Sequence, residues 1–354
     1  MSLKKMRKAI DQLDKKIIHL LNTRAKVTQG IARIKQKSGK SIYAPDRERE
    51  VLGKVTALGR GGPLSKAALE SIYREIMSSS LALEKPFRIA YLGPQATFTH
   101  LAALKRFGSQ VGYMACESIP DCFREVERDV ADYGVVPIEN SVEGAVTHTL
   151  DMFVDSDLKI CSQIILDVAH NLLANCPRAK IRRVYSNPQV FGQCRIWLQE
   201  NLAQAEMIEV SSTTRAAQIA SKEKYSACIA SLLAAKVYKL KVVAQDIEDS
   251  PYNITRFLVV GKTLPGPTLN DKTSILFSIK DKVGALHDML LPFKKHHINL
   301  TKIESRPSKK KAWDYYFFVD LEGHLASASV KKALAELEYK CKFLKVLGSY
   351  PVGE

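Results

Sequence analysis

An arginine and a threonine stand together in front of an apolar strand near position 255 of this 354-residue chain. Thr255 and Arg256 follow an acidic stretch at residues 246–249 and precede the apolar run at residues 257–260. An arginine can bind a carboxylate through two parallel hydrogen bonds, and a threonine hydroxyl can donate a hydrogen bond to a leaving oxygen. Such a pair by itself is more often a strand entry with a surface arginine. It indicates a site for a carboxylated substrate only when other motifs accompany it.

Polar side chains also interrupt the apolar seams of the first 85 residues. Arg24 stands where the alternating spacing of three and four demands an apolar side chain, and Ser80 does the same in a later segment. Glu48 falls on the apolar stripe of the segment between them. An arginine in a core seam is costly unless an anion meets it. Because Lys35 lies about three turns beyond Arg24 on the same face, the pattern indicates an anion-binding pocket.

Two further arginines extend this cationic set. Arg47 stands at the start of the second helical segment, and Arg7 lies about 100° around the first helix from Arg24. Arg7 could therefore not easily reach the same pocket from its own chain, but it could do so from the partner chain of an intertwined dimer. The alternative is a coiled coil in which Arg24 sets the register and the other cations are solvated.

Helical periodicity covers residues 1–85. The first helix is about thirty residues, or about 50 Å, long. It is too long to bury its seam on two shorter helices, so we expect its partner to be the same helix of a second chain. The second helix should begin near Asp46 and bury Leu58, and Ser65 is the expected N-cap of the third.

The rest of the chain changes pattern twice. Residues 88–263 alternate short apolar strands with helices, which is typical of an α/β domain. A linker containing prolines and a glycine then leads to residues 272–351, which follow the order βαββαβ. We therefore expect a multidomain fold with an all-α block, an α/β block and an α+β block of the ferredoxin-like type.

Further motifs accompany the Thr255 run in order and spacing. They occupy residues 91–100, 137–144, 186–189 and 193–195. With residues 253–257 they resemble the signature set of prephenate dehydratase. This resemblance implies two α/β lobes, like those of periplasmic binding proteins, with the last strand crossing back at the cleft.

For such a dehydratase we assign Thr255 as the hydrogen-bond donor to the departing hydroxyl of prephenate. Two roles remain open for Arg256: it could bind a substrate carboxylate, or it could be a structural tie between the lobes. Weaker cleft candidates are polar residues within or near these motifs: Asn140, Ser141, Ser186, Asn187, Gln189, Thr213 and Thr214. For residues 211–214 the alternative is helix capping.

The helical block resembles the all-helical chorismate mutase over residues 3–85. The resemblance places seven side chains in its active site: Arg7, Arg24, Lys35, Arg47, Glu48, Ser80 and Glu84. Arg7 and Arg24 would hold the two carboxylates of chorismate in the reactive conformation. Lys35 and Glu84 would stabilise the ether oxygen as negative charge develops on it, and Glu48 would accept a hydrogen bond from the ring hydroxyl.

Two positions of the helical block depart from relatives. Ala44 stands where some have aspartate, so its substrate contact would come from the backbone. Relatives often carry glutamine where this chain has Glu84. Because a carboxylic acid can donate a hydrogen bond and a carboxylate cannot, we expect Glu84 to work protonated and mutase activity to fall as the pH rises.

The last block resembles the ACT domain, a regulatory module. The residues that open its first helix and those that end its second strand resemble phenylalanine-binding motifs: Gly284, Ala285, Leu286, His287, Glu304, Ser305, Arg306 and Pro307. A helix N-terminus suits the ligand's carboxylate, and Glu304 could suit its amine. The family usually has valine where this chain has His287. The alternative is a dimerisation module without a ligand.

Composition narrows the class of protein. A hydrophobic fraction of 46% and a charged fraction of 25% are typical of globular proteins, and no apolar run reaches the length of a membrane span. Seven cysteines without CxxC pairs indicate reduced thiols in a cytoplasm. The net charge of +16 raises the alternative of a nucleic-acid binder. The cations are spread along the chain, however, and their densest cluster, at residues 309–311, is predicted to be a hairpin tip.

We therefore expect a bifunctional enzyme of phenylalanine biosynthesis. It would rearrange chorismate to prephenate, convert prephenate to phenylpyruvate and be inhibited by L-phenylalanine. We expect it to be at least a homodimer, to need no cofactor or metal, and to bind neither nucleic acid nor membrane. The alternative is a small-molecule sensor in which binding lobes and an ACT domain join an inert helical dimeriser.

Overall fold

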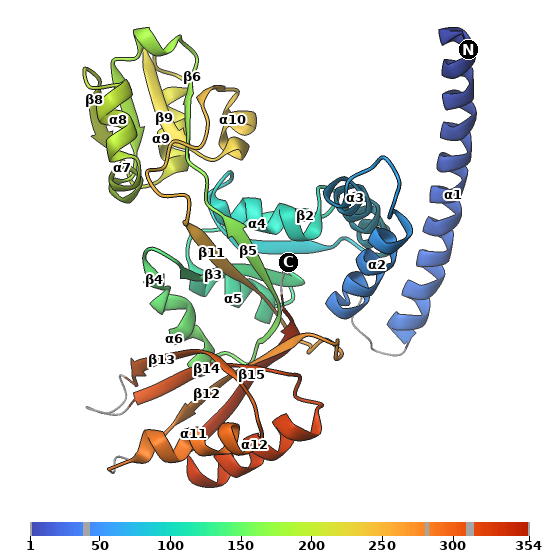
Figure 1. Cartoon of the computed structure of the whole chain (residues 1–354), viewed down its shortest axis with the longest axis vertical. Coiled ribbons are helices and arrows are strands. Elements are labelled where there is room, and N and C mark those ends of the chain that lie inside the picture. The colour runs from blue at the N-terminus through green and yellow to red at the C-terminus, as the bar shows by residue number, and fades with distance from the viewer. Residues whose placement is uncertain (1, 38–42, 280–282, 309–314, 353–354) are drawn as a thin grey trace. The chain divides into compact units, whose positions relative to one another are not determined.

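The structure is a computed structural model and describes residues 2–37, 43–279, 283–308 and 315–352. Along the chain it presents helices first, then an α/β region, then an α+β domain (Figure 1). The predicted fold class is therefore confirmed. The predicted hairpin tip at residues 309–311 lies outside the described residues.

The chain separates into two compact units. The first comprises Met1–Arg88 together with Arg106–Gly112. The second comprises Ile89–Lys105 together with Tyr113–Glu354.

Helices α1 (Leu3–Lys37), α2 (Pro45–Leu58) and α3 (Lys66–Glu84) build the first unit. Ser65 caps α3 as predicted, since its side chain accepts a hydrogen bond from the Ala68 backbone nitrogen at 3.2 Å. Helices α2 and α3 pack together, and each carries two buried apolar side chains: Leu52 and Val55 in α2, Met77 and Leu81 in α3. The prediction that Leu58 is buried was wrong. It is 87% exposed because it is the last residue of α2, where the chain turns away.

Helix α1 has the predicted apolar seam, but much of the seam faces solvent in the single chain. The apolar residues of its N-terminal half are between 51% and 64% exposed: Leu3, Met6, Ile10, Leu13 and Ile17. Ala32, near the other end, is buried, and α1 packs against α3. The long helix therefore presents an apolar stripe that the described residues of its own unit do not cover.

A short segment from further along the chain completes the helical unit. The Gln110 backbone nitrogen donates to Ser78 Oγ at 3.0 Å, and the Ser109 nitrogen donates to Glu75 Oε1 at 3.1 Å. Gly108 has φ +72°, and a Cβ at this position would lie 2.6 Å from Ser78 Cβ. Only glycine therefore allows this segment to approach α3 so closely.

The second unit begins with a mixed sheet of order β2-β1-β3-β11-β5, with β4 beside β3. Its strands are β1 (Arg88–Leu92), β2 (Gly112–Cys116), β3 (Tyr133–Asn140), β4 (Gly144–Ala145), β5 (Lys159–Asp167) and β11 (Ile254–Gly261). Its helices are α4 (Phe98–Phe107), α5 (Ile119–Glu127) and α6 (Thr147–Asp155).

A second sheet has the order β10-β6-β9-β7-β8. Its strands are β6 (Asn171–Ala174), β7 (Arg183–Ser186), β8 (Glu206–Glu209), β9 (Ser226–Ala230) and β10 (Lys241–Ala244). Its helices are α7 (Pro188–Gln193), α8 (Arg195–Asn201), α9 (Thr213–Ala220) and α10 (Leu232–Tyr238). The chain enters this sheet after β5 and returns through β11, which lies antiparallel between β3 and β5 (Figure 1). This double crossing produces the predicted pair of lobes.

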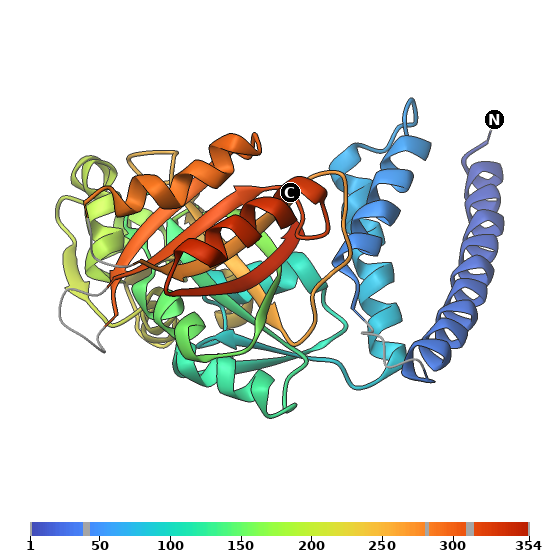
Figure 2. The same ribbon diagram turned by 90° about the horizontal axis from the view of Figure 1, so that it is seen from below.

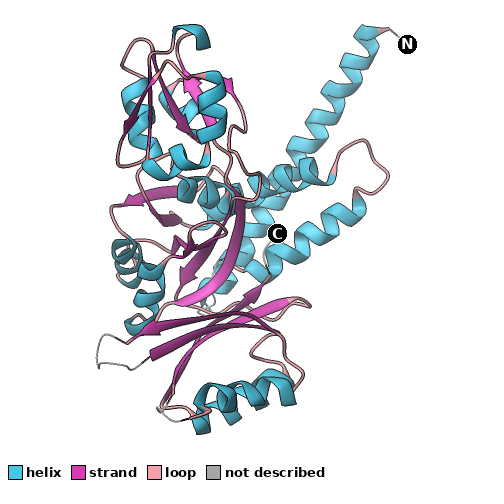
Figure 3. Ribbon diagram, turned by 60° about the vertical axis from the view of Figure 1, so that its left-hand side comes forward, coloured by secondary structure: helices cyan, strands magenta, loops and turns pink. Residues whose placement is uncertain are grey.

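The C-terminal domain has the sheet order β13-β14-β12-β15. Its elements are β12 (Asp271–Ser278), α11 (Ala285–Lys295), β13 (Leu300–Pro307), β14 (Tyr315–Glu322), α12 (Ala328–Lys340) and β15 (Phe343–Pro351). Both helices cover one face of the sheet, as Figures 2 and 3 show, and the core there includes Phe277, Phe293 and Leu337.

The other face of this C-terminal sheet packs against the first lobe. Leu276, Phe318 and Leu347 share one apolar core with Ile138 and Phe153. No helix among the described residues is both long enough and apolar enough to cross a lipid bilayer.

Candidate active sites

A cavity of about 410 Å³ in the second unit is lined by residues of both lobes. The lining comes from the loop after β1, from β3, from the segment after β5, from the N-termini of α7 and α9, and from β11. Predicted residues among the lining are Asn140, Asn187, Gln189, Thr213 and Thr255. The volume is within the range of small-molecule sites.

Thr255 is fixed with its hydroxyl at this cavity. Its Oγ1 accepts a hydrogen bond from Asn140 Nδ2 at 2.8 Å. The Asn140 amide is itself held, because its Oδ1 accepts from the backbone nitrogens of Val142 and Glu143, both at 2.9 Å. Within the described part of the chain, no acceptor takes the Thr255 hydroxyl proton. The hydroxyl can therefore donate that proton to a ligand.

A chain of amides extends this arrangement. Asn253 Oδ1 accepts from Asn140 Nδ2 at 2.8 Å, and Asn253 Nδ2 donates to Gln193 Oε1 at 3.0 Å. His170 Nε2 lies 2.7 Å from the same Gln193 oxygen. Because that oxygen is an acceptor, His170 must carry its proton on Nε2. Burial lowers the pKa of His170, although Gln193 and Glu248 oppose the shift, so the imidazole is neutral and holds the amide chain in one orientation.

Sequence reasoning missed three of these residues. Asn253 and Gln193 stand inside motifs that were recognised, but those motifs were interpreted through their hydroxyl and charged groups. The internal hydrogen bonds link residues 60 and 113 positions apart, so no local spacing indicates them. His170 had no sequence signal, since it is a lone histidine between two strands.

Three of the weaker cleft candidates do not line the cavity. Ser141 Oγ donates to the Tyr252 carbonyl at 2.7 Å, and Ser186 Oγ donates to the Ile229 carbonyl at 3.1 Å. Thr214 is fully buried in α9. In the same segment the Ser212 side chain caps α9, because it accepts from the Arg215 backbone nitrogen at 3.1 Å, while Thr213 lines the cavity.

Arg256 points away from this cavity, so its interpretation as a ligand for a substrate carboxylate is corrected here. Its Nη1 lies 2.6 Å from Asp320 Oδ2, and its Nη2 donates to the Tyr350 hydroxyl at 2.9 Å. Successive side chains of a strand project to opposite faces, so Thr255 and Arg256 cannot both face the cleft. Of the two predicted roles, the structural tie fits, although it joins the first lobe to the C-terminal domain.

In the helical unit, Arg24 and Ser80 meet as their seam positions predict. Arg24 is half-buried, and its Nη1 donates to Ser80 Oγ at 2.7 Å. Lys35 and Glu84 are also half-buried and interact electrostatically. Burial raises the pKa of Glu84, while the Lys35 charge opposes the shift. Glu84 Oε2 is buried without a hydrogen-bond partner, as expected of a group that awaits a ligand.

Glu48 lies between two arginines that the sequence analysis did not single out. Its Oε2 is 3.4 Å from Arg106 Nη2 and 3.8 Å from Arg74 Nη1. Burial raises the pKa of Glu48, and both arginine charges oppose this. Arg106 Nε also donates to the Tyr43 hydroxyl at 2.6 Å. The missed arginines lie 26 and 58 positions beyond Glu48, so only the fold reveals their approach.

The remaining mutase candidates lie apart from this group or at its edge. Arg47 is exposed and pairs with Glu50 one turn along α2. Arg7 is exposed on α1. Ala44 is the half-buried N-cap residue of α2, and its carbonyl accepts from the Glu48 backbone nitrogen at 3.0 Å.

The two predicted phenylalanine-binding motifs lie in different elements of the C-terminal domain. Gly284 takes a left-handed conformation, φ +76°, as the N-cap of α11, followed by the buried Ala285 and the exposed Leu286 and His287. Glu304 and Arg306 form the half-buried side of β13, while Ser305 and Pro307 are exposed. Arg306 Nη2 is engaged by Asp151 of α6, 3.2 Å from Oδ1.

Three family models match consecutive parts of the chain. Chorismate mutase type II matches residues 6–85, prephenate dehydratase matches residues 89–264, and the ACT domain matches residues 273–339.

Relatives of known identity match over almost the full length. A bifunctional chorismate mutase/prephenate dehydratase from Aquifex aeolicus is 52% identical over 353 residues, which cover 99% of this chain and 98% of that protein. Its counterpart from Pseudomonas aeruginosa is 44% identical over 356 residues, covering 99% and 97%. A prephenate dehydratase from Arthrobacter aurescens, solved in complex with L-Phe, matches with a TM-score of 0.70 and 34% identity over 75% of this chain and 90% of that one. This chain therefore belongs to the family of bifunctional chorismate mutase/prephenate dehydratases.

Proposed function

We propose that this chain rearranges chorismate to prephenate in its helical unit and converts prephenate to phenylpyruvate in its α/β lobes. The observation that carries the second assignment is the Thr255 hydroxyl, whose oxygen is occupied by Asn140 and whose proton is available at the cavity. The two carboxylates of chorismate also explain why cations gather in the helical unit.

The mutase reaction needs positioning and stabilisation of charge rather than a covalent partner. In chorismate the ether C–O bond breaks while a new C–C bond forms, and negative charge develops on the ether oxygen. Arg24, oriented by Ser80, would hold a substrate carboxylate. Lys35 and a protonated Glu84 would donate hydrogen bonds to the ether oxygen. Glu48 would accept a hydrogen bond from the ring hydroxyl.

The dehydratase reaction expels two groups from the prephenate ring. The bond from the ring to its carboxylate breaks and releases CO₂, and its electron pair enters the ring. The hydroxyl across the ring then leaves and takes up a proton to become water. Thr255 donates a hydrogen bond to that departing oxygen, which stabilises its negative charge without full proton transfer, because a threonine hydroxyl is a weak acid. Aromatisation drives the step.

The substrate carboxylates need a ligand other than Arg256. Ser212 and Thr213 line the cavity at the N-terminus of α9, an eight-residue helix. A helix N-terminus presents free backbone N–H groups and a partial positive charge to an anion. Asn187 and Gln189, at the start of α7, add polar groups on the same lobe.

We assign L-phenylalanine as the inhibitor that acts through the C-terminal domain. The N-terminus of α11, which begins after Gly284, is suited to its carboxylate, and Glu304 to its amine. The solved relative in complex with L-Phe supports this ligand. Arg306 is engaged by Asp151 and is assigned to the domain interface rather than to the ligand.

We further infer a homodimer built on α1 and a cytoplasmic location. The uncovered apolar stripe of α1 fits the same stripe of a second copy, which would bring Arg7 of the partner chain toward the site. All seven cysteines are free thiols and are buried or half-buried, which fits a reducing compartment.

One coupled assay tests the whole proposal. The full chain is supplied with chorismate, and phenylpyruvate is followed with and without millimolar L-phenylalanine. We expect phenylpyruvate to form and L-phenylalanine to slow it. A chain that consumes no chorismate would refute the mutase assignment, and prephenate accumulating without phenylpyruvate would refute the dehydratase assignment.

A further inference from the structure

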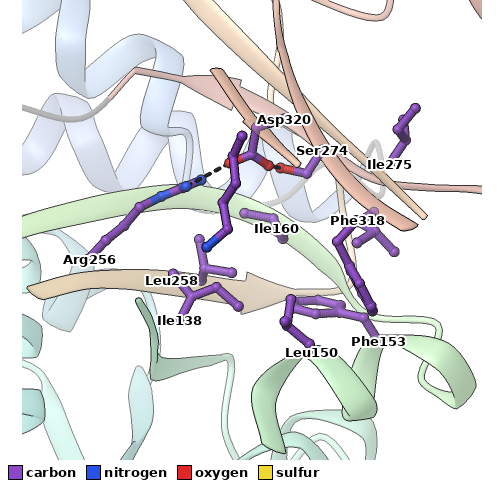
Figure 4. A pocket seen from close by; sticks show the side chains of 12 residues that line it. Ile138, Leu150, Phe153, Ile160, Arg256, Leu258, Ser274, Ile275, Phe318 and Asp320 are labelled. Carbon is purple, nitrogen blue, oxygen red and sulfur yellow. Dashed lines mark hydrogen bonds and ion pairs between the residues drawn. The ribbon is translucent and has the colours of Figure 1, made fainter. Parts of the chain in front are cut away.

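Strand β11 connects the dehydratase cavity to the C-terminal sheet through two adjacent residues. Thr255 lines the cavity, while the side chain of Arg256 projects from the other face and is only 11% exposed. Figure 4 shows the Arg256 guanidinium directed at Asp320, and Asp320 in turn bonded to Ser274. The same short stretch of backbone therefore carries a residue of the cavity and a residue of the domain interface.

The partners of Arg256 come from two strands of the C-terminal sheet, and a residue of a third strand holds both partners. Asp320 of β14 accepts from Arg256 at 2.6 Å and, through its other oxygen, from Ser274 of β12 at 2.5 Å. Tyr350 of β15 accepts from Arg256 at 2.9 Å and lies 2.7 Å from Ser274 Oγ. Burial alone would lower the Arg256 pKa, but Tyr350 and Asp320 raise it. The guanidinium is thus permanently charged and held from several directions.

A second link runs beside the first. Glu139 of β3 pairs in register with Arg256, and its Oε2 lies 3.6 Å from Arg256 Nη1 and 3.0 Å from Lys302 Nζ of β13. Glu139 immediately precedes Asn140, which holds the Thr255 hydroxyl. Both neighbours of the Asn140–Thr255 pair are therefore attached to the C-terminal sheet.

The surroundings exclude a ligand for these charges. The cavity beside Arg256 and Asp320 has a volume of about 20 Å³, room for about one water molecule. Its other walls are mainly apolar, including Ile138, Leu258 and Phe318. A charge pair enclosed by apolar side chains fixes one arrangement of its two elements, because any other arrangement leaves a buried charge unpaired.

We propose that Arg256 is a positioning residue for the dehydratase, through which the C-terminal sheet fixes strand β11 and hence the Thr255 hydroxyl. The Arg256–Asp320 pair is then the route by which a change in that sheet alters turnover of prephenate. The inference rests on the proposed role of Thr255.

The test uses the full chain with Asp320→Asn. This variant keeps the side-chain shape but removes the charge that holds Arg256. Dehydratase kcat should fall by roughly tenfold, within the range of couplings through residues that touch neither ligand, while KM and mutase activity stay near wild type. The inhibition by L-phenylalanine should weaken as well. Arg256→Lys keeps the positive charge but cannot make both guanidinium contacts, so its dehydratase kcat should lie between those of the wild type and Asp320→Asn.

Two further variants separate positioning from general stability. Lys345→Met is the matched control, because Lys345 is a half-buried cation of β15 whose Nζ donates to the Ser156 carbonyl at 2.7 Å and pairs with Asp157 at the same interface. It should leave kcat and inhibition unchanged. The double variant Arg256→Met with Asp320→Leu removes both charges and leaves no buried charge unpaired. It should therefore be thermally more stable than Asp320→Asn, but it should not show the wild-type response to L-phenylalanine.

The proposal is overturned if a stable Asp320→Asn enzyme keeps wild-type kcat and inhibition, or if Lys345→Met causes the same losses. It is also overturned if the double variant regains both stability and full inhibition, since the pair would then be only structural. A fully active Thr255→Val enzyme would instead refute the donor role of Thr255, and the Asp320→Asn result would still decide the coupling.

Discussion

At the scale of the residue, the hydrogen bond that the Thr255 oxygen already accepts determines what its hydroxyl can do. Asn140 donates to its oxygen, so its proton remains for the departing hydroxyl of prephenate. Thr255→Val preserves the shape and removes the donor, so dehydratase kcat should fall by about a hundredfold or more. Thr255→Ser is the matched control and should keep most of the activity. Both rates are measured as phenylpyruvate formed from prephenate, and wild-type turnover by the valine variant would eliminate the donor role.

Glu84 makes the mutase sensitive to pH. Burial raises the pKa of Glu84 and Lys35 opposes it, so the acid form persists to higher pH than in an ordinary glutamate. As the pH rises through this raised pKa, the side chain loses its proton and can no longer donate to the ether oxygen. Mutase kcat/KM should therefore decline at the alkaline side.

A glutamine at this position separates the role of the proton from other effects. Glu84→Gln donates a hydrogen bond at every pH, so its mutase profile should be flat where the wild-type profile falls. Prephenate turnover in the same samples serves as the internal control. The same alkaline decline in both chains would contradict a protonated Glu84.

The sequence predicted some of these residues because their chemistry conflicts with their position. Arg24 and Ser80 interrupt apolar seams, and the structure brings them together. The face of β11 from which Arg256 projects could not be predicted. Strand β11 is buried on both faces, so its sequence has no polar alternation to show which face meets the cleft. Asn253 and His170 act through partners distant in the chain, which spacing does not reveal.

At the scale of the element, helix α1 has an apolar stripe that the described residues of the helical unit leave exposed. Ile10, Leu13 and Ile17 are more than half exposed. A charge placed in this stripe should disrupt the proposed dimer and, with it, the part of the mutase site that the partner chain supplies. Leu13→Glu should therefore yield a monomer with much lower mutase activity and near-normal dehydratase activity.

A second substitution on the same helix controls for charge alone. Lys15→Glu alters a polar position two residues away, outside the stripe, and should leave the dimer intact. Mass is measured by light scattering during gel filtration, and both activities are measured on the same fractions. A Leu13→Glu chain that remains dimeric and active would show that α1 is not the contact.

Periodicity predicted the helices better than the strands at sheet edges. The spacing of three and four predicted a first helix of about thirty residues, and α1 has 35. Ser65 was predicted as the N-cap of α3 from its residue type. Strands β8 and β10 were not predicted, since each lies at an edge of the second sheet and is largely exposed. Strand β8 has a glutamate at each end and only two apolar residues between them, so its sequence resembles a loop.

At the scale of the whole molecule, the order of the three folds could be predicted because each block has a different order of helical and strand patterns. The full set of segments that build the helical unit could not be predicted. The unit also includes Arg106–Gly112, which lie beyond residue 85, where the helical periodicity ends. Gly108 and Ser109 contact α3 more than twenty residues after it ends, through a close backbone approach and a backbone hydrogen bond. The sequence near residue 85 therefore carries no signal for these contacts.

The central claim is that Arg24 and Thr255 serve two separate reactions on one chain. The most direct measurement supplies chorismate to Arg24→Leu, to Thr255→Val and to a mixture of the two, and follows prephenate and phenylpyruvate against an enzyme-free control. We predict that Arg24→Leu leaves chorismate unused yet converts added prephenate, that Thr255→Val accumulates prephenate, and that the mixture restores phenylpyruvate. Phenylpyruvate at the wild-type rate from either single variant supplied with chorismate would contradict the account.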